Sequence, residues 1–260
     1  MTREYDGLAD IYDLWAEADA SATPSLAFYV ALMRGPARER VELGVGTGRI
    51  AIPILQEGGC LTGVDASPRM LDLCRAKADR AGVSGRLRLL QRDVRQLDLD
   101  TPAELVTFPF RSIGHLLTDA DKLACFRSVY ANLVPGGRFV FDHYVWDEAW
   151  ARAHDGVSTL MVDHEFTDYR LRVYDTYRYR YSDQRMDCSV RIQRVSTGDD
   201  RLLDDRLQHF EFSWFEVCQV RQWAQEIGFE VEALFGSFDA SDDHGPQSVN
   251  QVWTLRRPVN

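Results

Sequence analysis

Residues 41–50 read "VELGVGTGRI" and place Gly44, Gly46 and Gly48 directly after a short apolar run. A backbone without side chains lets a ligand approach closely, and the N–H groups of a following helix can point at it. The spacing is G-x-G-x-G, because Arg49 occupies the position where a dinucleotide fingerprint G-x-G-x-x-G has its third glycine, and the third glycine comes one residue early, at Gly48. Glu42 precedes the loop and would repel a pyrophosphate. The stretch therefore predicts a ligand without a pyrophosphate.

The surrounding sequence predicts an α/β fold. From residue 39 to 143, short apolar runs alternate with helical patterns, which is typical of parallel βαβ units. Ser67 and Pro68 have the residue types of a helix N-cap and first turn. The predicted strands are 40–43, 60–64, 87–90, 104–108 and 138–141, and the final runs 229–235 and 249–255 are expected to join the same sheet.

After residue 150 the hydrophobic period becomes twofold. Leu171, Val173, Tyr177, Tyr179 and Tyr181 share one parity, and residues 186–192 alternate in the same way beyond a Ser-Asp-Gln turn. This pattern is typical of an antiparallel hairpin with one buried face. We therefore expect a single domain over residues 1–260, with an antiparallel insertion at 155–213 between the fifth strand and the last helix. The buried face could rest on the domain itself or on a second subunit, which would make the insertion a homodimer contact.

Two acids follow the next two strands. Asp65 ends the second run, where a carboxylate can accept the hydroxyl protons of a ribose. Asp93 ends the third run, and with Val94 beside it could receive an adenine amino group and cover the ring. Either acid could instead be a turn or capping residue. Together with the glycine loop, these residues indicate a nucleoside ligand.

Four stretches now carry a resemblance to a family. "VELGVGTGRIAIPI", "GVDASPRML", "QRDVRQLDL" and "LVPGGRFVFD" resemble the successive motifs of class I S-adenosylmethionine-dependent methyltransferases, over about residues 5–143. The resemblance implies a three-layer, Rossmann-like, seven-stranded sheet with a reversed final strand. It also implies S-adenosylmethionine as cofactor and S-adenosylhomocysteine as product.

The resemblance assigns the cofactor site residue by residue. Glu42 and the three glycines would surround the methionine part, and Asp65 would bind the ribose. Adenine would lie between Ala66 and Met70, with its edge held by Asp93 and Val94, and Phe108 would sit near the sulfonium. Tyr12, in "YDGLADIYDLW", would help to close the pocket as a tyrosine does in related small-molecule enzymes, or would simply dock the amino-terminal helix.

The acceptor side centres on "FPFRSIGHLLTD", which follows the fourth strand. His115 in this segment resembles the histidine of an "IGHL" stretch in amino-sugar N-methyltransferases of macrolide pathways, where it faces the acceptor. The exit of strand five, "FDHYVWDEAW", departs from those enzymes, so the pockets need not match. With an ordinary pKa near 6.5, His115 would be a neutral base at pH 7, or would only position the acceptor. His143 and Tyr144 could contact the acceptor or pack.

The amino-acid composition limits the kinds of partner that the protein can bind. Forty acidic and thirty basic residues give a net charge of −10, the wrong sign for nucleic acid or anionic membranes. The amino terminus lacks the apolar run of a signal peptide, so we expect a cytoplasmic protein acting on a small molecule. Five cysteines without a CxxC pair predict neither a disulfide framework nor a zinc site, and "DASDDHGPQ" is expected to be a solvated loop, so no metal is predicted.

Three functions stay open. The first is methyl transfer to a nitrogen or oxygen of a small molecule such as a sugar or natural-product intermediate. The second is a non-catalytic protein of the same fold that binds the cofactor without transferring the methyl group. A nicotinamide dehydrogenase is the third, and the glycine spacing disfavours it.

Overall fold

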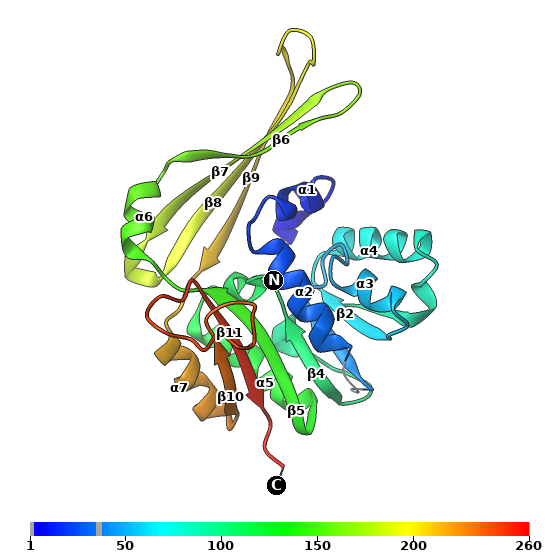
Figure 1. Cartoon of the computed structure of the whole chain (residues 1–260), viewed down its shortest axis with the longest axis vertical. Helices are drawn as coiled ribbons and strands as arrows, with labels where there is room; N and C mark the ends of the chain where they lie inside the picture. The colour runs from blue at the N-terminus through cyan, green and yellow to red at the C-terminus, as the bar shows by residue number, and fades with distance from the viewer. Residues whose placement is uncertain (1–2, 35–37, 260) are drawn as a thin grey trace.

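The computed structural model describes residues 3–34 and 38–259. Residues 1–2, 35–37 and 260 of the expected domain lie outside this described part. The chain forms two sheets, labelled A and B, that stand one above the other (Figure 1). No helix in the described ranges combines the length and apolar character needed to cross a bilayer.

Sheet A is the predicted seven-stranded sheet, in the order β10-β11-β5-β4-β1-β2-β3. Strands β1 to β5 run parallel to one another in this sheet. Strand β11 is antiparallel to both of its neighbours, β5 and β10, so the predicted reversed final strand is confirmed. The strands are β1 (Arg40–Leu43), β2 (Leu61–Asp65), β3 (Leu87–Gln91), β4 (Ala103–Phe108), β5 (Leu133–Tyr144), β10 (Glu230–Phe235) and β11 (Asn250–Arg256).

Helices cover both faces of sheet A, which gives the three layers that were predicted. Helices α5 (Asp119–Asn132) and α7 (Val217–Ile227) pack on one face around Phe126 and Trp223. The other face carries α2 (Ala22–Met33), α3 (Ala51–Gln56) and α4 (Pro68–Arg80). Ser67 caps α4 as predicted, since its hydroxyl accepts a hydrogen bond from the Met70 N–H.

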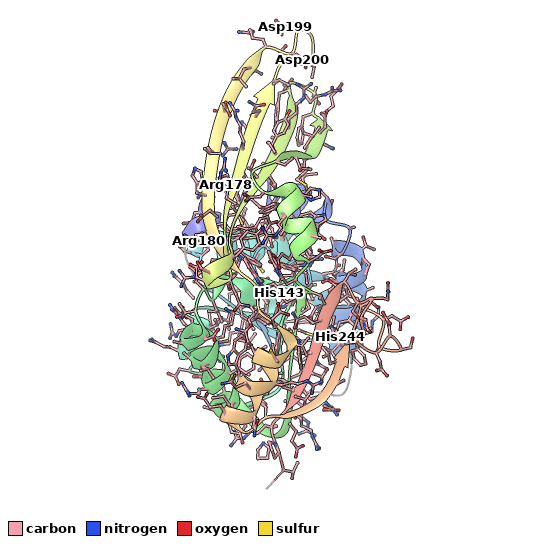
Figure 2. The ribbon with its side chains drawn as sticks, turned by 90° about the vertical axis from the view of Figure 1, so that its left-hand side faces the viewer. His143, Arg178, Arg180, Asp199, Asp200 and His244 are labelled. Carbon is pink, nitrogen blue, oxygen red and sulfur yellow. The ribbon has the colours of Figure 1, made fainter. Side chains whose placement is uncertain are left out.

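Sheet B is larger than the predicted hairpin. Four antiparallel strands follow the short helix α6 (Glu148–His154): β6 (Ser158–Glu165), β7 (Arg170–Arg180), β8 (Arg185–Val195) and β9 (Leu202–Ser213). Its apolar face lies over the amino-terminal segment, which includes the 3-10 turn η1 (Arg3–Gly7) and α1 (Tyr12–Glu17). Figure 2 shows Asp199 and Asp200 at the far tip of this sheet, and His143 where the two sheets meet. The face therefore rests on the chain's own amino terminus.

Candidate active site

A cavity of about 860 Å³ lies between the carboxyl edge of sheet A, the amino-terminal segment and sheet B. This is the edge at which ligands bind in open α/β sheets. Of the predicted site residues, the cavity is lined by Tyr12, Gly44, Gly46, Asp65, Met70 and His115. Glu42, Gly48, Ala66, Asp93, Val94 and Phe108 lie outside the lining.

The glycine loop needs its glycines for backbone reasons. Gly44, Gly46 and Gly48 have φ values of +64°, +56° and +85°, a region that side chains disfavour. A Cβ on Gly44 would lie 3.2 Å from Ser112 Cβ, and one on Gly48 would lie 2.8 Å from Cys74 Sγ. A Cβ would thus be crowded at Gly44 and Gly48, whereas it has room at Gly46, and both Gly44 and Gly46 line the cavity.

Asp65 stands at the end of β2 and reaches back to the loop. One carboxylate oxygen accepts the Gly46 N–H at 2.9 Å, and the other accepts the Ser67 N–H at 2.9 Å. Burial raises the pKa of Asp65. A carboxylate offers about four lone-pair positions, so these backbone bonds leave acceptor capacity for a hydroxyl donor of a ligand.

Glu42 lies under the loop and is 2% exposed. Its Oε2 is buried and has no hydrogen-bond partner among the described residues. Desolvation raises the pKa of Glu42 to about 8, although the nearby Arg49 lowers it. Because buried carboxylate oxygens are normally satisfied, this oxygen indicates that a donor belongs beside the loop.

Tyr12 closes the same corner. A Cβ on Gly46 would come within 3.9 Å of its ring, and burial raises the pKa of Tyr12 to about 12. The neighbouring Asp13 holds α1 in place, since it accepts the Thr47 hydroxyl and pairs with Lys77. The pocket-closing role of Tyr12 stays a prediction, and its position is compatible with it.

The predicted adenine end is less complete. Met70 lines the cavity, whereas Val94 and Phe108 are fully buried in the core of sheet A. Asp93 pairs with Arg95 at 2.5 Å, and the hydrogen bonds of this guanidinium lower the pKa of Asp93 to about 2. Arg95 also contacts Asp121, which ties the turn after β3 to α5. The adenine roles of Ala66, Asp93 and Val94 stay predictions.

His115 ends a 3-10 turn, η4 (Ser112–His115), and its Nε2 lies 3.0 Å from the Tyr5 hydroxyl. Its ring also contacts Phe212 of sheet B at a centroid distance of 4.9 Å. Desolvation lowers the pKa of His115 to about 4, so the expectation of an ordinary pKa near 6.5 is wrong. Enclosure among aromatic rings disfavours the charged imidazolium, and no carboxylate of the described residues contacts the ring to offset this.

Comparison with known proteins agrees with this geometry. The methyltransferase domain family matches residues 41–137. Glycine/sarcosine N-methyltransferase of Parasynechococcus marenigrum is 30% identical over 240 residues, covering 91% of this chain and 79% of the relative. The chain belongs to the S-adenosylmethionine-dependent methyltransferases.

Solved structures show the same fold over nearly the whole chain. The CcbJ methyltransferase of Streptomyces caelestis has a TM-score of 0.80 at 25% identity, with 99% of this chain and 98% of that chain covered. CalS10, an amino pentose methyltransferase from Micromonospora echinaspora solved with S-adenosylmethionine bound, has a TM-score of 0.69 at 18% identity, covering 95% and 96%. The insertion therefore belongs to the fold that this methyltransferase shares with them.

The residues of this methyltransferase fit the family's cofactor. The backbone of Gly44 and Gly46 lines the cavity, a Cβ at Gly46 would fill space beside Tyr12, and Asp65 keeps acceptor capacity for hydroxyl groups. The unpaired Oε2 of Glu42 suits the ammonium group of a methionine chain.

Sequence reasoning missed the support of the acceptor loop. Phe110 and Arg111 have φ values of +56° and +60°, which two consecutive residues other than glycine rarely adopt. The Asp142 carboxylate accepts both of their N–H groups, at 2.8 and 3.0 Å, and the Tyr29 hydroxyl at 2.6 Å. Asp142 closes the quoted stretch "LVPGGRFVFD", but nothing in the pattern indicated this role.

His143 and Tyr144 separate in the structure. His143 is fully buried between the backbone carbonyls of Ser213 and Tyr144, and burial lowers its pKa to about 3. Tyr144 lines the cavity, and its buried hydroxyl has no partner among the described residues. Of the two residues, Tyr144 therefore faces the acceptor space and His143 packs.

Proposed function

We propose that this methyltransferase transfers a methyl group to an amine nitrogen of a small molecule. The observation that carries the proposal is the single cavity of about 860 Å³, in which the glycine loop and the side chains of sheet B line the same space. Cavities of roughly 300–1,000 Å³ hold small ligands and cofactors. The cavity suits a cofactor together with a small acceptor.

The choice of nitrogen over oxygen rests on the chemistry of His115. A hydroxyl acceptor needs a base to take its proton, and an imidazole whose pKa is lowered to about 4 is a weak base. An amine gains its lone pair when its ammonium form releases a proton to solvent, so the neutral amine can take the methyl group without a protein base. The likeness to the glycine/sarcosine N-methyltransferase of Parasynechococcus marenigrum supports the same choice.

The cofactor supplies a methyl group that is already activated as a sulfonium. The chain's own residues then have to hold the acceptor close to it and in line, which can account for most of the rate. We propose that His115 and Tyr5 orient the acceptor, because their hydrogen-bonded pair lines the cavity between the glycine loop and sheet B. The loop at Phe110 and Arg111, held by Asp142, fixes the position of this pair.

The test is a methyl-transfer screen with matched acceptors. Purified protein and S-adenosylmethionine are incubated with amines and their hydroxyl counterparts, such as glucosamine with glucose and benzylamine with benzyl alcohol, and products are identified by mass spectrometry. Methylated amines with unchanged alcohols are expected. Methylation of the hydroxyl compounds alone would contradict the nitrogen assignment. Tight binding of S-adenosylhomocysteine without any product would favour the non-catalytic alternative.

A further inference from the structure

The inner face of sheet B carries one buried acid in an apolar surround. Asp175 lies on β7 directly opposite Val190 of β8, and it is 1% exposed. The residues of β7 and β8 that share its face are mainly apolar or aromatic: Leu171, Val173, Tyr177, Met186, Cys188 and Ile192. A carboxylate in such a position is costly unless a partner compensates it.

Only neutral groups hold this carboxylate in the described structure. Trp15 Nε1 lies 3.0 Å from each of its oxygens, and the Tyr177 hydroxyl donates to Oδ2 at 2.9 Å. No lysine, arginine or histidine within residues 3–34 and 38–259 forms an ion pair with it. The nearest anion, Asp19, is itself paired with Arg111 at 2.7 Å. The charge of Asp175 is therefore not cancelled from within the described chain.

The carboxylate is nevertheless ionised near neutral pH. Burial raises the pKa of Asp175 to about 6, and the bonds from Tyr177 and Trp15 oppose the rise. At pH 7.5 most molecules carry the negative charge. Retaining an uncompensated charge at a buried position is typical of functional sites.

Asp175 faces the cavity together with aromatic rings. Trp15, Tyr177, Tyr179 and Phe210 line the same space, and so does Tyr144, whose hydroxyl has no partner among the residues that the structure describes. Such a site attracts a cation in two ways: the carboxylate attracts it by its negative charge, and the aromatic faces attract it by their quadrupoles.

The carboxylate is also close to the cofactor end. The Tyr12 ring lies next to Gly46, the centroids of Tyr12 and Trp15 are 6.2 Å apart, and Trp15 bonds Asp175. A small molecule that reaches from Asp175 toward the glycine loop would pass these rings and His115.

We propose that Asp175 is a specificity-determining residue that binds a cationic ammonium group of the acceptor, with Trp15 and Tyr177 holding its carboxylate in place. The inference rests on the proposed function, since it names the charge state in which the amine acceptor binds. Binding itself changes no protonation state. One N–H proton of a bound amine must then pass to solvent before that nitrogen can take the methyl group.

The test uses a cation and its neutral counterpart as probes. Binding of phenethylammonium and of 2-phenylethanol is measured by calorimetry or ligand-observed NMR at pH 7.5, with S-adenosylhomocysteine saturating. The wild type should bind the ammonium about tenfold or more tightly than the alcohol, as expected for a charge-assisted hydrogen bond. Asp175→Asn should abolish this preference and leave the affinity for the alcohol within about twofold.

One further variant serves as a control. Asp187→Asn removes the same charge from the opposite face of the sheet, where Asp187 pairs with Arg180, and should keep the preference. Tyr177→Phe removes one donor that holds the carboxylate and should reduce the preference without abolishing it. Unchanged affinity for S-adenosylhomocysteine reports that each variant is folded.

The wild-type measurement alone can overturn the proposal. Equal affinity for the two probes, or no binding of the ammonium, would remove the cation site, and so would a preference that survives in Asp175→Asn. These results would leave methyl transfer to amines intact, because that function is tested by product formation.

Discussion

The cavity has two walls that are built in different ways. The carboxyl edge of sheet A presents the backbone of Gly44 and Gly46, from one short loop, together with Asp65. The inner face of sheet B presents side chains, and its carboxylate Asp175 is held by Trp15, which is 160 positions away in the chain. The first wall suits a cofactor common to a family, and the second suits an acceptor that differs between members.

The two walls also differ in the donors that stabilise a buried carboxylate. At the edge, both Asp65 oxygens accept backbone N–H groups, which stabilise a carboxylate without a counter-ion. On sheet B, the donors to Asp175 within the described part of the chain are an indole and a phenol, those of Trp15 and Tyr177. A ligand that brings positive charge should therefore gain more at the second wall than at the first.

The largest effect is expected between the walls, at Asp142. Asp142→Ala leaves the N–H groups of Phe110 and Arg111 and the Tyr29 hydroxyl without their acceptor, while two left-handed residues keep their strain. The free energy of unfolding should fall by about 3–5 kcal/mol, measured by urea denaturation. Tyr29→Phe removes a single bond and should cost about 1 kcal/mol. Equal losses in the two variants would show that Asp142 does not support the loop.

A second effect concerns the edge and its pH dependence. The folded-state pKa of Glu42 is raised from 4.5 to about 8, so the unfolded chain ionises first as pH rises. The contribution of Glu42 to stability is therefore lost progressively between about pH 4.5 and 8. Glu42→Gln should raise the free energy of unfolding at pH 9 by a few kcal/mol and flatten this decline, measured by denaturation at several pH values. A pH profile identical to that of the wild type would contradict the raised pKa.

Substitutions in the two walls should differ in their effect on cofactor affinity. Asp65→Ala should weaken binding of S-adenosylhomocysteine by about 1.5–3 kcal/mol, the range for hydrogen bonds to a charged group, as measured by calorimetry. Asp72→Asn, on the exposed surface of α4, removes the same charge and should leave binding unchanged. Asp175→Asn should also leave it unchanged. Comparable losses of S-adenosylhomocysteine affinity in the Asp65 and Asp175 variants would mean that the cofactor and the acceptor do not bind to separate walls.

The smallest effect is expected at His115. His115→Ala should lower kcat/KM by about tenfold through misplacement of the acceptor and should leave cofactor affinity intact. Since burial lowers the pKa of His115 to about 4, the wild-type pH–rate profile should show no step near 6.5 that disappears in this variant. Such a step, lost on substitution, would restore the role of His115 as a base.

Some of the site could be predicted because its signals are local. A glycine with positive φ, a cap at Ser67 and an acid at the end of β2 each give a recognisable sequence pattern within a few residues. No such local pattern indicated the contacts of Tyr5 and Trp15. Their partners, His115 and Asp175, come from segments that only the fold brings beside them.

The sequence by itself determined the succession of strands along the chain, the glycine loop and the family. These features depend on alternation, spacing and glycine content, which are patterns among residues close together in the chain. Only the tertiary structure decided that Asp175 faces the cavity, that Asp142 supports the acceptor loop and that burial lowers the pKa of His115. Burial and hydrogen bonding set the charge of a side chain, and both depend on which distant segments pack against it.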